Sequence, residues 1–517
     1  MACVSERPAD PSGGSARAAT VVVVGGGIAG LTVAHRLATL GVSVRLLEGS
    51  PRLGGKLAHA ELAGVPVDTG AEALLNRRPE AVALAREVGL GDDIRHPDST
   101  AAGVWSRGAL RPLPPTVLGV PSDLAALSRS GVISPVAVVR AGLERLLPGR
   151  FGALPTPRDE SADDPLEDVS VGRFVAGRLG PGVRDRLLEP LLGGIYAGSA
   201  DELSLVAAAP QVAALARHGG SLLVAAERSR LEAGAKPAVP VFAGVVGGVS
   251  RLAESVAAAA VAAGAVLHTG VSVRALAARD PASPGARWQL AVGRADLGEL
   301  VDADAVVIAT PAASATRLLA GVVPAAAREL RRIDYASVAL VTLAVPASGV
   351  WVPPERSGYL VPPVEGRAAT AVTWSSNKWA WVRDRASHDH GGGTVVVRVS
   401  FGRHRQANVL QRDDTDLVDL AVAELSDASG LSGPLIDARV DRWGGALPQY
   451  AVGHAARVAR IRTAVEQTAG LEVCGAAYDG VGVAACVADG RRAAERIARW
   501  LAARPGGVDP QRGTMRA

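Results

Sequence analysis

Apolar runs and helical periodicity alternate at the start of the chain. Residues 20–24 form a short β-branched apolar run, and residues 31–40 follow with apolar side chains three to four positions apart. Gly41 ends this predicted helix, and a second apolar run covers residues 42–47. A strand, a helix and a strand within about 30 residues form the β-α-β unit of a parallel sheet. The pattern therefore predicts an α/β fold at this end of the chain.

The hydrophobic pattern changes several times further along. Helical patterns interrupted by proline and glycine dominate residues 97–230, and residues 303–310 form a buried strand. Between residues 335 and 443 apolar positions alternate, which is typical of an antiparallel sheet. Residues 471–501 lead from a strand through a glycine-rich turn into a long amphipathic helix. This order predicts a Rossmann-like domain built from discontinuous segments, a domain with a mixed or antiparallel sheet, and a helical insertion.

The length supports more than one folding unit. At about 150 residues per domain, 517 residues correspond to roughly three units. Apolar residues make up 48% of the chain and charged residues 21%, which excludes a disordered protein. The predicted divisions are a flexible lead-in at 1–19, a dinucleotide-binding domain made of 20–96, 235–315 and 455–503, a mainly helical insertion at 97–230, a substrate-binding sheet domain at 316–454 and a tail at 504–517.

Composition excludes several classes of function. The 55 basic and 51 acidic residues nearly cancel, and no run of like charges marks a nucleic-acid-binding tail. Cys3, Cys474 and Cys486 contain no C-x-x-C pair, which argues against a disulfide scaffold and a zinc site. The first twenty residues lack the apolar core of a signal peptide, and no apolar run reaches the roughly 18 residues of a membrane span. We expect a cytoplasmic protein without a metal, a nucleic-acid partner or a transmembrane segment, and peripheral membrane contact stays open.

A glycine-rich turn carries the clearest chemical signal. Gly25, Gly27 and Gly30 fit G-x-G-x-x-G between the first predicted strand and helix. The first glycine permits a tight turn, the second lets a diphosphate approach the backbone, and the third lets the helix pack on the strand. Glu48 ends the second strand, where a carboxylate can accept both ribose hydroxyls. The predicted dinucleotide-binding residues here are Gly25, Gly26, Gly27, Ile28, Ala29, Gly30 and Glu48.

Two later segments point to FAD and not to a nicotinamide. Gly54 and Gly55 follow an arginine and permit a second backbone approach to the diphosphate. Near the C-terminal end, residues 474–483 lead into a helix whose N-terminus can face a flavin ring and stabilise negative charge on it. The further cofactor candidates are Arg52, Gly54, Gly55, Lys56, Val273, Gly475, Tyr478, Gly482 and Val483.

These segments resemble a known family. Val21 to Leu57 is similar to the FAD fingerprint of the flavin amine-oxidase superfamily, and other segments resemble its porphyrinogen oxidases, copro- and protoporphyrinogen oxidases together. The similar segments follow one another in family order from about residue 20 to 500. They are DTGAE at 68–72, NRRP at 76–79, EPLLGGIYAG at 189–198, LSL at 203–205, VVIATP at 306–311, WSSNKW at 374–379, LPQYAVGH at 447–454 and YDGVG at 478–482.

The resemblance implies an FAD-dependent oxidase of haem biosynthesis. The implied reaction is the oxygen-dependent, six-electron conversion of coproporphyrinogen III to coproporphyrin III, with three molecules of hydrogen peroxide as the second product. Oxidation of protoporphyrinogen IX is the alternative, and an FAD-dependent amine oxidase is a third interpretation that the scarcity of aromatic residues disfavours. A non-catalytic flavoprotein is a further alternative. The resemblance also implies transient contact with an iron-inserting enzyme, and it identifies no catalytic base.

Substrate recognition rests on four candidates. Porphyrinogens carry propionates, and arginine binds carboxylates with two parallel hydrogen bonds. By the resemblance, Arg78 is the first candidate and Arg77 the second, although a solvated charge at a helix start is an equal interpretation. Tyr196 can line the cavity or pack in the core. Lys378 can position the flavin or the substrate, or stack on tryptophan as a structural cation.

Overall fold

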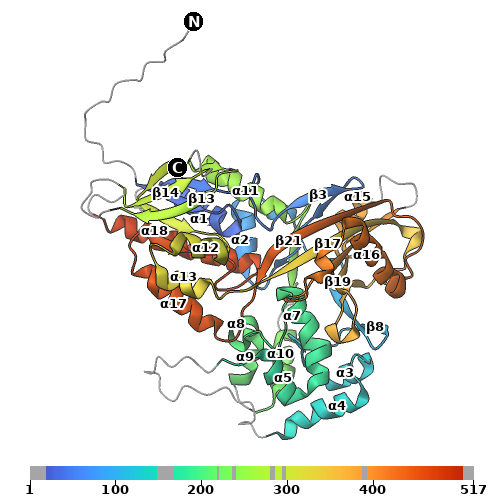
Figure 1. The fold of residues 1–517 in the computed structure, drawn as a ribbon. Helices are drawn as coiled ribbons and strands as arrows, with labels where there is room; N and C mark the ends of the chain where they lie inside the picture. Colours follow the sequence, from blue (N-terminus) through green and yellow to red (C-terminus); the bar gives the residue numbers. More distant parts are fainter. Residues whose placement is uncertain are drawn as a thin grey trace, which may run out of the picture.

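The computed structural model describes residues 19–147, 168–217, 220–235, 240–279, 286–293, 298–386 and 393–504. The predicted lead-in and tail therefore lie almost wholly outside the described residues, as does Cys3. A parallel five-stranded sheet forms the first part of the molecule (Figure 1). Its strands come from distant segments, in agreement with the predicted α/β fold. In spatial order they are β12 (Val266–His268), β2 (Ser43–Leu47), β1 (Thr20–Val24), β16 (Ala305–Ile308) and β22 (Leu471–Val473).

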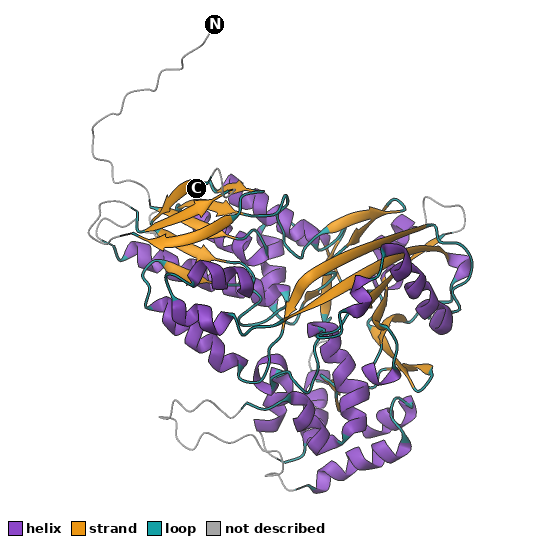
Figure 2. Cartoon of the chain, viewed as in Figure 1, coloured by secondary structure: helices purple, strands orange, loops and turns teal. Residues whose placement is uncertain are grey.

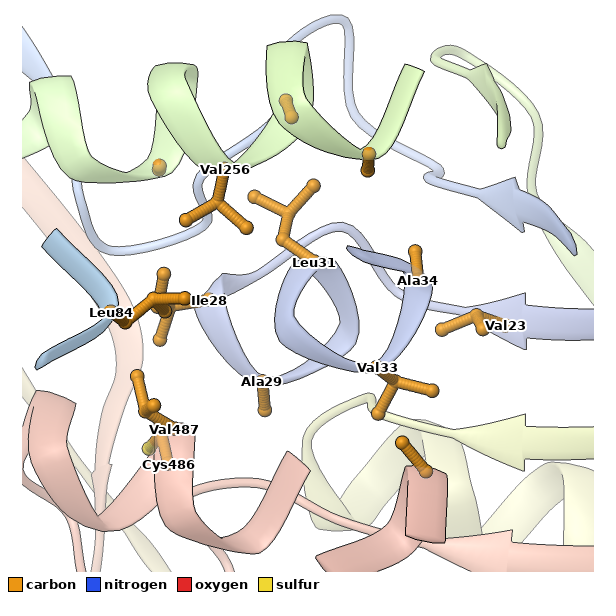
Figure 3. Packing of buried hydrophobic residues seen from close by; sticks show 14 of the residues in the cluster. Val23, Ile28, Ala29, Leu31, Val33, Ala34, Leu84, Val256, Cys486 and Val487 are labelled. Atoms are coloured by element: carbon orange, nitrogen blue, oxygen red, sulfur yellow. The ribbon is translucent and has the colours of Figure 1, made fainter. Parts of the chain in front are cut away.

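Four helices cover one face of this sheet. They are α1 (Ile28–Thr39), α2 (Pro79–Glu87), α11 (Ser250–Ala262) and α18 (Val483–Ala502). The strands are apolar on both faces because helices bury one side and a second layer buries the other. Figure 3 shows side chains of α1 reaching toward Val256 of α11, Leu84 of α2 and Val487 of α18. The glycine-rich turn is thus anchored in the largest apolar core of this part.

The opposite face of the parallel sheet carries a small antiparallel sheet and three helices. The antiparallel strands are β13 (Val273–Ala278), β14 (Trp288–Val292) and β15 (Glu299–Ala303), paired in that order. Trp288 and Tyr478 are the large side chains of the core between these layers. The helices that close the core are α12 (Ala312–Leu319), α13 (Pro324–Leu330) and α17 (His454–Glu466).

A seven-stranded sheet forms the second part. Of its six pairs of neighbouring strands, five are antiparallel and one, β18 with β7, is parallel, which confirms the predicted mixed or antiparallel sheet. The alternating pattern 394–401 is one strand, and helix α16 (Asp414–Ser429) covers the face that carries Val397, Val399 and Phe401. The spatial order is β21 (Asp437–Pro448), β17 (Tyr335–Pro346), β20 (Thr394–Phe401), β19 (Ala369–Trp374), β18 (Arg356–Leu360), β7 (Ala101–Ser106) and β8 (Ala109–Pro112).

The interval 97–230 begins with strands and becomes helical afterwards. Hairpin β7–β8 turns at Arg107 and Gly108, both with positive φ, and its first strand runs parallel to β18. The sequence pattern indicated few strands here because an edge hairpin is short and only partly buried. The two-stranded β9–β10 (Thr116–Val117, Val120–Pro121) follows. The helices are α3 (Leu124–Ser130), α4 (Pro135–Gly142), α5 (Val171–Leu179), α7 (Glu189–Tyr196), α8 (Leu205–Ala208), α9 (Pro210–Arg217) and α10 (Leu222–Gly234).

Side-chain caps and one buried ion pair organise the helical part, which lies at the lower end of Figure 2. Asp123, Ser134, Ser170 and Ser221 each accept a hydrogen bond from a first-turn N–H of the helix that follows. Glu144 is fully buried and pairs with Arg178 while accepting N–H bonds at the start of α10. No helix in the described ranges has both the length and the apolarity that a bilayer crossing requires.

Candidate cofactor and substrate site

Each glycine of the G-x-G-x-x-G turn lacks a side chain for a different steric reason. Gly25 has φ +108°, and a Cβ there would lie 2.7 Å from the carbonyl oxygen of Ala309. A Cβ on Gly30 would lie 1.9 Å from the carbonyl oxygen of Gly25, inside the contact distance. A Cβ on Gly27 would meet no atom within 4 Å. The first and third glycines therefore let the chain pack, and the second leaves open space in front of the helix.

That open space faces the N-terminus of α1. Gly27 is the N-cap of α1 and has no side chain to satisfy the first-turn N–H groups. These groups and the positive end of the helix dipole create a site for an anion. Ile28 and Ala29, in the first turn, are buried and offer only their backbone. The turn fits the diphosphate of a dinucleotide.

Glu48 is fixed at the end of β2 by backbone donors. Its carboxylate accepts hydrogen bonds from the N–H of Gly26 at 2.6 Å and of Ser50 at 2.7 Å. A carboxylate has about four acceptor positions, so two remain for hydroxyl groups. The predicted ribose contact is compatible with this geometry and stays a prediction. Val273 begins β13 close by, because Gly270 and Val271 donate to the carbonyl oxygens of Ser50 and Glu48.

A second glycine loop lies against the first. The N–H of Gly54 donates to the carbonyl oxygen of Gly26 at 2.8 Å, and Gly54 forms an isolated parallel bridge with Gly27. A Cβ on Gly55 would lie 3.2 Å from the Cα of Gly27. Gly54 and Gly55 both have positive φ. The two glycine loops therefore lie side by side, and the predicted double backbone approach to one ligand stays a prediction.

Arg52 and Lys56 flank this loop. The guanidinium of Arg52 donates to the carbonyl oxygens of Gly55 at 2.7 Å and of Leu53 at 3.2 Å, and it stacks on the ring of Trp443. Arg52 thus organises the loop through its carbonyl groups. Burial lowers the pKa of Lys56 from its usual range. Lys56 follows the two glycines directly, and its predicted contact with the cofactor stays a prediction.

The turn before α18 provides a second helix N-terminus. Gly482 is the N-cap of α18, and a Cβ on it would meet no atom within 4 Å. Gly475 and Gly480 have φ +124° and +142°. A Cβ on Gly490 would lie 2.6 Å from the carbonyl oxygen of Ala29, so α18 packs closely on α1. Two uncapped helix N-termini, that of α1 and that of α18 beginning at Val483, therefore belong to adjacent helices.

Tyr478 supports this turn from behind. Its ring is fully buried in the core between the layers, and its hydroxyl has no hydrogen-bond partner within the described part of the chain. Its carbonyl oxygen accepts a hydrogen bond from Nε2 of His454 at 3.1 Å, which identifies the tautomer with hydrogen on Nε2. Burial lowers the pKa of His454 to about 4. His454 is therefore a neutral, structural histidine at physiological pH.

Arg78, the first of the predicted substrate residues, lies close to the turn before α18. It is the N-cap of α2 and pairs with Glu80 at 3.0 Å, and its side chain is 43% exposed. A Cβ on Gly480 would lie 3.9 Å from Nη1 of Arg78, so the guanidinium is beside the turn before α18. Arg77 is exposed to solvent. Both remain available to a carboxylate ligand.

Tyr196 and Lys378 have neighbours that the sequence did not reveal. Tyr196 is buried in the helical core, with its ring 5.5 Å from that of Tyr450. Lys378 lies 3.5 Å from the carboxylate of Glu72 and 5.3 Å from the ring centre of Trp379. The structural interpretation of each residue has direct support in these contacts. Their predicted substrate contacts stay predictions.

Three residues of the region were missed by sequence reasoning. Trp443 donates from Nε1 to the carbonyl oxygen of Thr69 at 2.6 Å. Arg398 donates to the carbonyl oxygens of Asp68 and Gly70. Glu72, although part of a recognised segment, was assigned no role. The one signal available in the sequence was that Arg398 is a polar residue on a strand with alternating apolar positions. This signal does not reveal which residue Arg398 contacts.

Known proteins are similar to this chain along most of its length. The profile of flavin-containing amine oxidoreductases matches residues 28–498. A coproporphyrinogen III oxidase of Mycobacterium leprae (strain TN) is 36% identical over 479 residues, covering 92% of this chain and 97% of that protein. A chloroplastic protoporphyrinogen oxidase of Nicotiana tabacum is 26% identical over 95% of this chain and 87% of its own. A crystal structure from Exiguobacterium sp. 255-15, provisionally assigned as a protoporphyrinogen oxidase, has a TM-score of 0.76 and 27% identity, covering 94% and 99% of the two chains.

Proposed function

Because this chain belongs to the family of flavin-containing amine oxidoreductases, we propose that it binds FAD and oxidises coproporphyrinogen III to coproporphyrin III in haem biosynthesis. The observation that carries the substrate proposal is similarity along nearly the whole length of a coproporphyrinogen III oxidase, at 36% identity. The backbone site at Gly27, Gly54 and Gly482 supports a diphosphate-containing flavin such as FAD. The first feature concerns the substrate and the second the cofactor, so each can fail separately.

The chain's own groups bind and orient. The first-turn N–H groups of α1 and the positive end of its dipole hold a diphosphate, with Lys56 adding positive charge. The N-terminus of α18 stabilises negative charge that develops on a bound ring. Arg78, beside the turn before α18, and the exposed Arg77 provide donors for propionates. When bound, the flavin supplies the acceptor for the hydride equivalents and passes them to oxygen.

The proposed reaction balances without a further reductant or oxidant. Six electrons and six protons leave the porphyrinogen in three two-electron steps. Three molecules of oxygen accept them and become three molecules of hydrogen peroxide. Arrangement of the substrate against the cofactor, and exclusion of water, are the tasks that remain for the protein.

Protoporphyrinogen IX is the second candidate substrate. The similarity to the tobacco protein and to the Exiguobacterium structure favours it, although identity there is lower than to the Mycobacterium leprae protein. The two substrates differ in carrying four or two propionates, so exposed arginines such as Arg77 and Arg78 favour the more acidic one. An amine oxidase is a third alternative.

One experiment separates these candidates. Purified protein is expected to be yellow, and its flavin absorbance to bleach when coproporphyrinogen III is added without oxygen. The decisive measurement is kcat/KM for coproporphyrinogen III, protoporphyrinogen IX and a primary amine, each under oxygen, with hydrogen peroxide counted per product. A ratio above ten in favour of coproporphyrinogen III supports the proposal, and the reverse ratio replaces it with the second candidate.

We further propose that the protein works in the cytoplasm and contacts membranes only at its surface. The exposed residues Val136, Val139, Leu143 and Leu146 lie on one side of α4 and the short helix η2 (Leu143–Leu146), which supports a peripheral contact. Transient contact with the enzyme that inserts iron follows from the reactivity of the product and is a separate proposal.

A further inference from the structure

A buried ion cluster joins the two sheet-containing parts of the molecule. It consists of Glu72, Lys378 and Arg398, whose side chains are 11%, 16% and 14% exposed. Glu72 follows strand β4 (Val65–Asp68), Lys378 ends helix α14 (Ser375–Lys378), and Arg398 is in the middle of β20. Neither the diphosphate turns nor the proposed propionate contacts use these three groups.

Glu72 is fully engaged. Its Oε1 accepts hydrogen bonds from Nε1 of Trp379 at 2.9 Å and from the hydroxyl of Ser375 at 3.1 Å. Its Oε2 lies 3.5 Å from Nζ of Lys378 and 3.9 Å from Nη1 of Arg398. The two cations hold the pKa of Glu72 below its usual range even though burial opposes this. The carboxylate is therefore ionised, and these four partners all come from the second part of the molecule.

Arg398 fastens the backbone of the same loop. Its guanidinium donates to the carbonyl oxygen of Gly70 at 2.8 Å and of Asp68 at 3.2 Å. The carbonyl oxygen of Thr69, between them, accepts the hydrogen bond of Trp443 from strand β21. Three consecutive carbonyl groups are thus held by side chains of the seven-stranded sheet, and the loop 68–72 is clamped to it.

The other side of this loop contacts the cofactor loop. The N–H of Ala71 donates to the carbonyl oxygen of Lys56 at 3.2 Å, and a Cβ on Gly70 would lie only 2.0 Å from that oxygen. Asp68 accepts N–H bonds from Val249 and Ser250 at the start of α11. Loop 68–72 is therefore in direct contact with the backbone of Lys56, the residue after the two glycines.

Little water can reach the cluster. The cavity beside it has a volume of about 10 Å³, room for roughly one water molecule. Thr342 Oγ1 and Trp381 Nε1 line this cavity and have no hydrogen-bond partner among the described residues. With so little solvent, the charges of Glu72, Lys378 and Arg398 interact strongly, and loss of the Glu72 charge leaves two cations uncompensated.

We propose that Glu72 is a positioning residue: with Arg398 and Lys378 it locks loop 68–72 to the seven-stranded sheet and so sets the position of the cofactor loop relative to the substrate side. The inference rests on the flavin site and not on the identity of the substrate. Lys378 then acts as the partner of Glu72.

The test compares Glu72→Gln with Glu299→Gln, an exposed glutamate on the remote strand β15. Glu72→Gln keeps the shape of the side chain and removes its charge. It is expected to bind flavin, to change the visible circular dichroism of the bound flavin, and to lower the rate constant of anaerobic flavin reduction by coproporphyrinogen III at least tenfold with KM changed less than threefold. The double variant with Lys378→Met restores the net charge of the cluster and is expected to recover at least a third of the wild-type rate constant.

Three results would overturn the proposal. One is a Glu72→Gln protein with unchanged dichroism and unchanged rate constant. A second is a lower melting temperature with an unchanged rate constant, because it means a role in folding only. If Glu72→Gln does not fold, Arg398→Lys is measured in its place, because this variant keeps the positive charge and loses the contact with two carbonyl groups. Unchanged flavin dichroism in Arg398→Lys is the third result that would overturn the proposal. If wild-type protein is not reduced by coproporphyrinogen III, the proposed function fails, while the dichroism still decides the role of Glu72.

Discussion

The phenol oxygen of Tyr450 accepts a hydrogen bond from the backbone N–H of Gly480 at 2.7 Å and donates its own hydrogen to the carbonyl oxygen of Ala476 at 2.7 Å. One buried hydroxyl thus closes the turn that precedes α18. Tyr450→Phe leaves a partly buried donor and a partly buried acceptor without this partner. We expect the free energy of unfolding to fall by about 1–3 kcal/mol, measured by urea denaturation.

Tyr478→Phe is the matched control for that measurement. Its ring is as deeply buried, but its hydroxyl has no partner in the described residues. Removal of this hydroxyl is expected to leave stability unchanged or to raise it, because a buried unpaired polar group is lost. Equal destabilisation by the two substitutions would show that the bonds of Tyr450 to the turn contribute nothing.

Replacement of Gly27 tests the cofactor site in front of helix α1. The backbone at Gly27 has φ −70° and ψ 173°, which a β-branched residue adopts readily, and its Cβ direction is open. Gly27→Val is therefore expected to fold, with its side chain filling the space in front of α1, and to be purified with less than a tenth of the wild-type flavin content. Absorbance at 450 nm per protein measures this. Gly177→Ala, in a helix and with equal open space, is the control; a yellow Gly27→Val protein would contradict the assignment.

Local patterns predicted the elements that carry the cofactor turn. The run 20–24 is strand β1 as predicted, because a buried parallel strand is apolar throughout. The helix begins at Ile28, three positions before the apolar period at Leu31, since the dihedral angles after Gly27 start it and not the hydrophobic pattern. The strand 394–401 was also predicted with its ends, because its burial alternates.

Long-range partners could not be predicted. Arg398 and Asp68 are 330 residues apart, and nothing in either local pattern indicates the other. The parallel pairing of β7 with β18 could not be predicted for the same reason, because nothing in the pattern of residues 101–106 indicates residues 356–360 as its neighbour. The role of Glu48 was predicted from its place at a strand end, but its bonds to Gly26 and Ser50 depend on the fold of the turn. The domain boundaries remain a prediction.

Substitution of Arg78 tests the propionate contact. Its guanidinium is partly exposed and lies beside the turn before α18. A charge-assisted pair contributes about 1.5–3 kcal/mol, so Arg78→Ala is expected to raise KM for coproporphyrinogen III roughly tenfold or more, with kcat lowered less. Steady-state kinetics measure both constants. Arg86→Ala, at the exposed end of the same helix α2, is the control, and an unchanged KM in Arg78→Ala would remove this residue from the site.

The buried carboxyl of Asp68 makes stability depend on pH. Burial raises its pKa to about 6, whereas the unfolded chain titrates near 4. Between these values the unfolded state has lost the proton that the folded state keeps, so this group lowers stability as the pH rises from 4 to 6, by about 3 kcal/mol in all. The difference in free energy of unfolding between wild type and Asp68→Asn is expected to decrease by that amount across this window. Urea unfolding at four pH values measures it, and a difference that stays constant across this window would contradict the raised pKa.

The exposed apolar side of α4 and η2 leads to a prediction about membranes. Val136, Val139, Leu143 and Leu146 are 79%, 64%, 50% and 79% exposed and repeat at helical spacing, at the end of the helical part farthest from the parallel sheet (Figure 1). An apolar helical stripe of this kind lies in the interface of a bilayer, where its side chains leave water. The protein is expected to float with vesicles of phosphatidylglycerol and phosphatidylcholine in a density gradient, and the fourfold serine variant to lose at least nine tenths of that binding, because each buried side chain contributes about 1.5–3 kcal/mol at full burial.

The control for the membrane experiment removes exposed apolar side chains elsewhere. Val261 and Leu300 are 54% and 61% exposed in the part that contains the parallel sheet, and their replacement by serine is expected to leave flotation unchanged. Loss of binding in this control as well would mean that general surface hydrophobicity drives the association. The remaining explanation is that the apolar stripe is buried between two copies of the chain. Sedimentation of wild type and of the fourfold serine variant without vesicles tests it, because such a contact would change the mass of the particle and not its flotation.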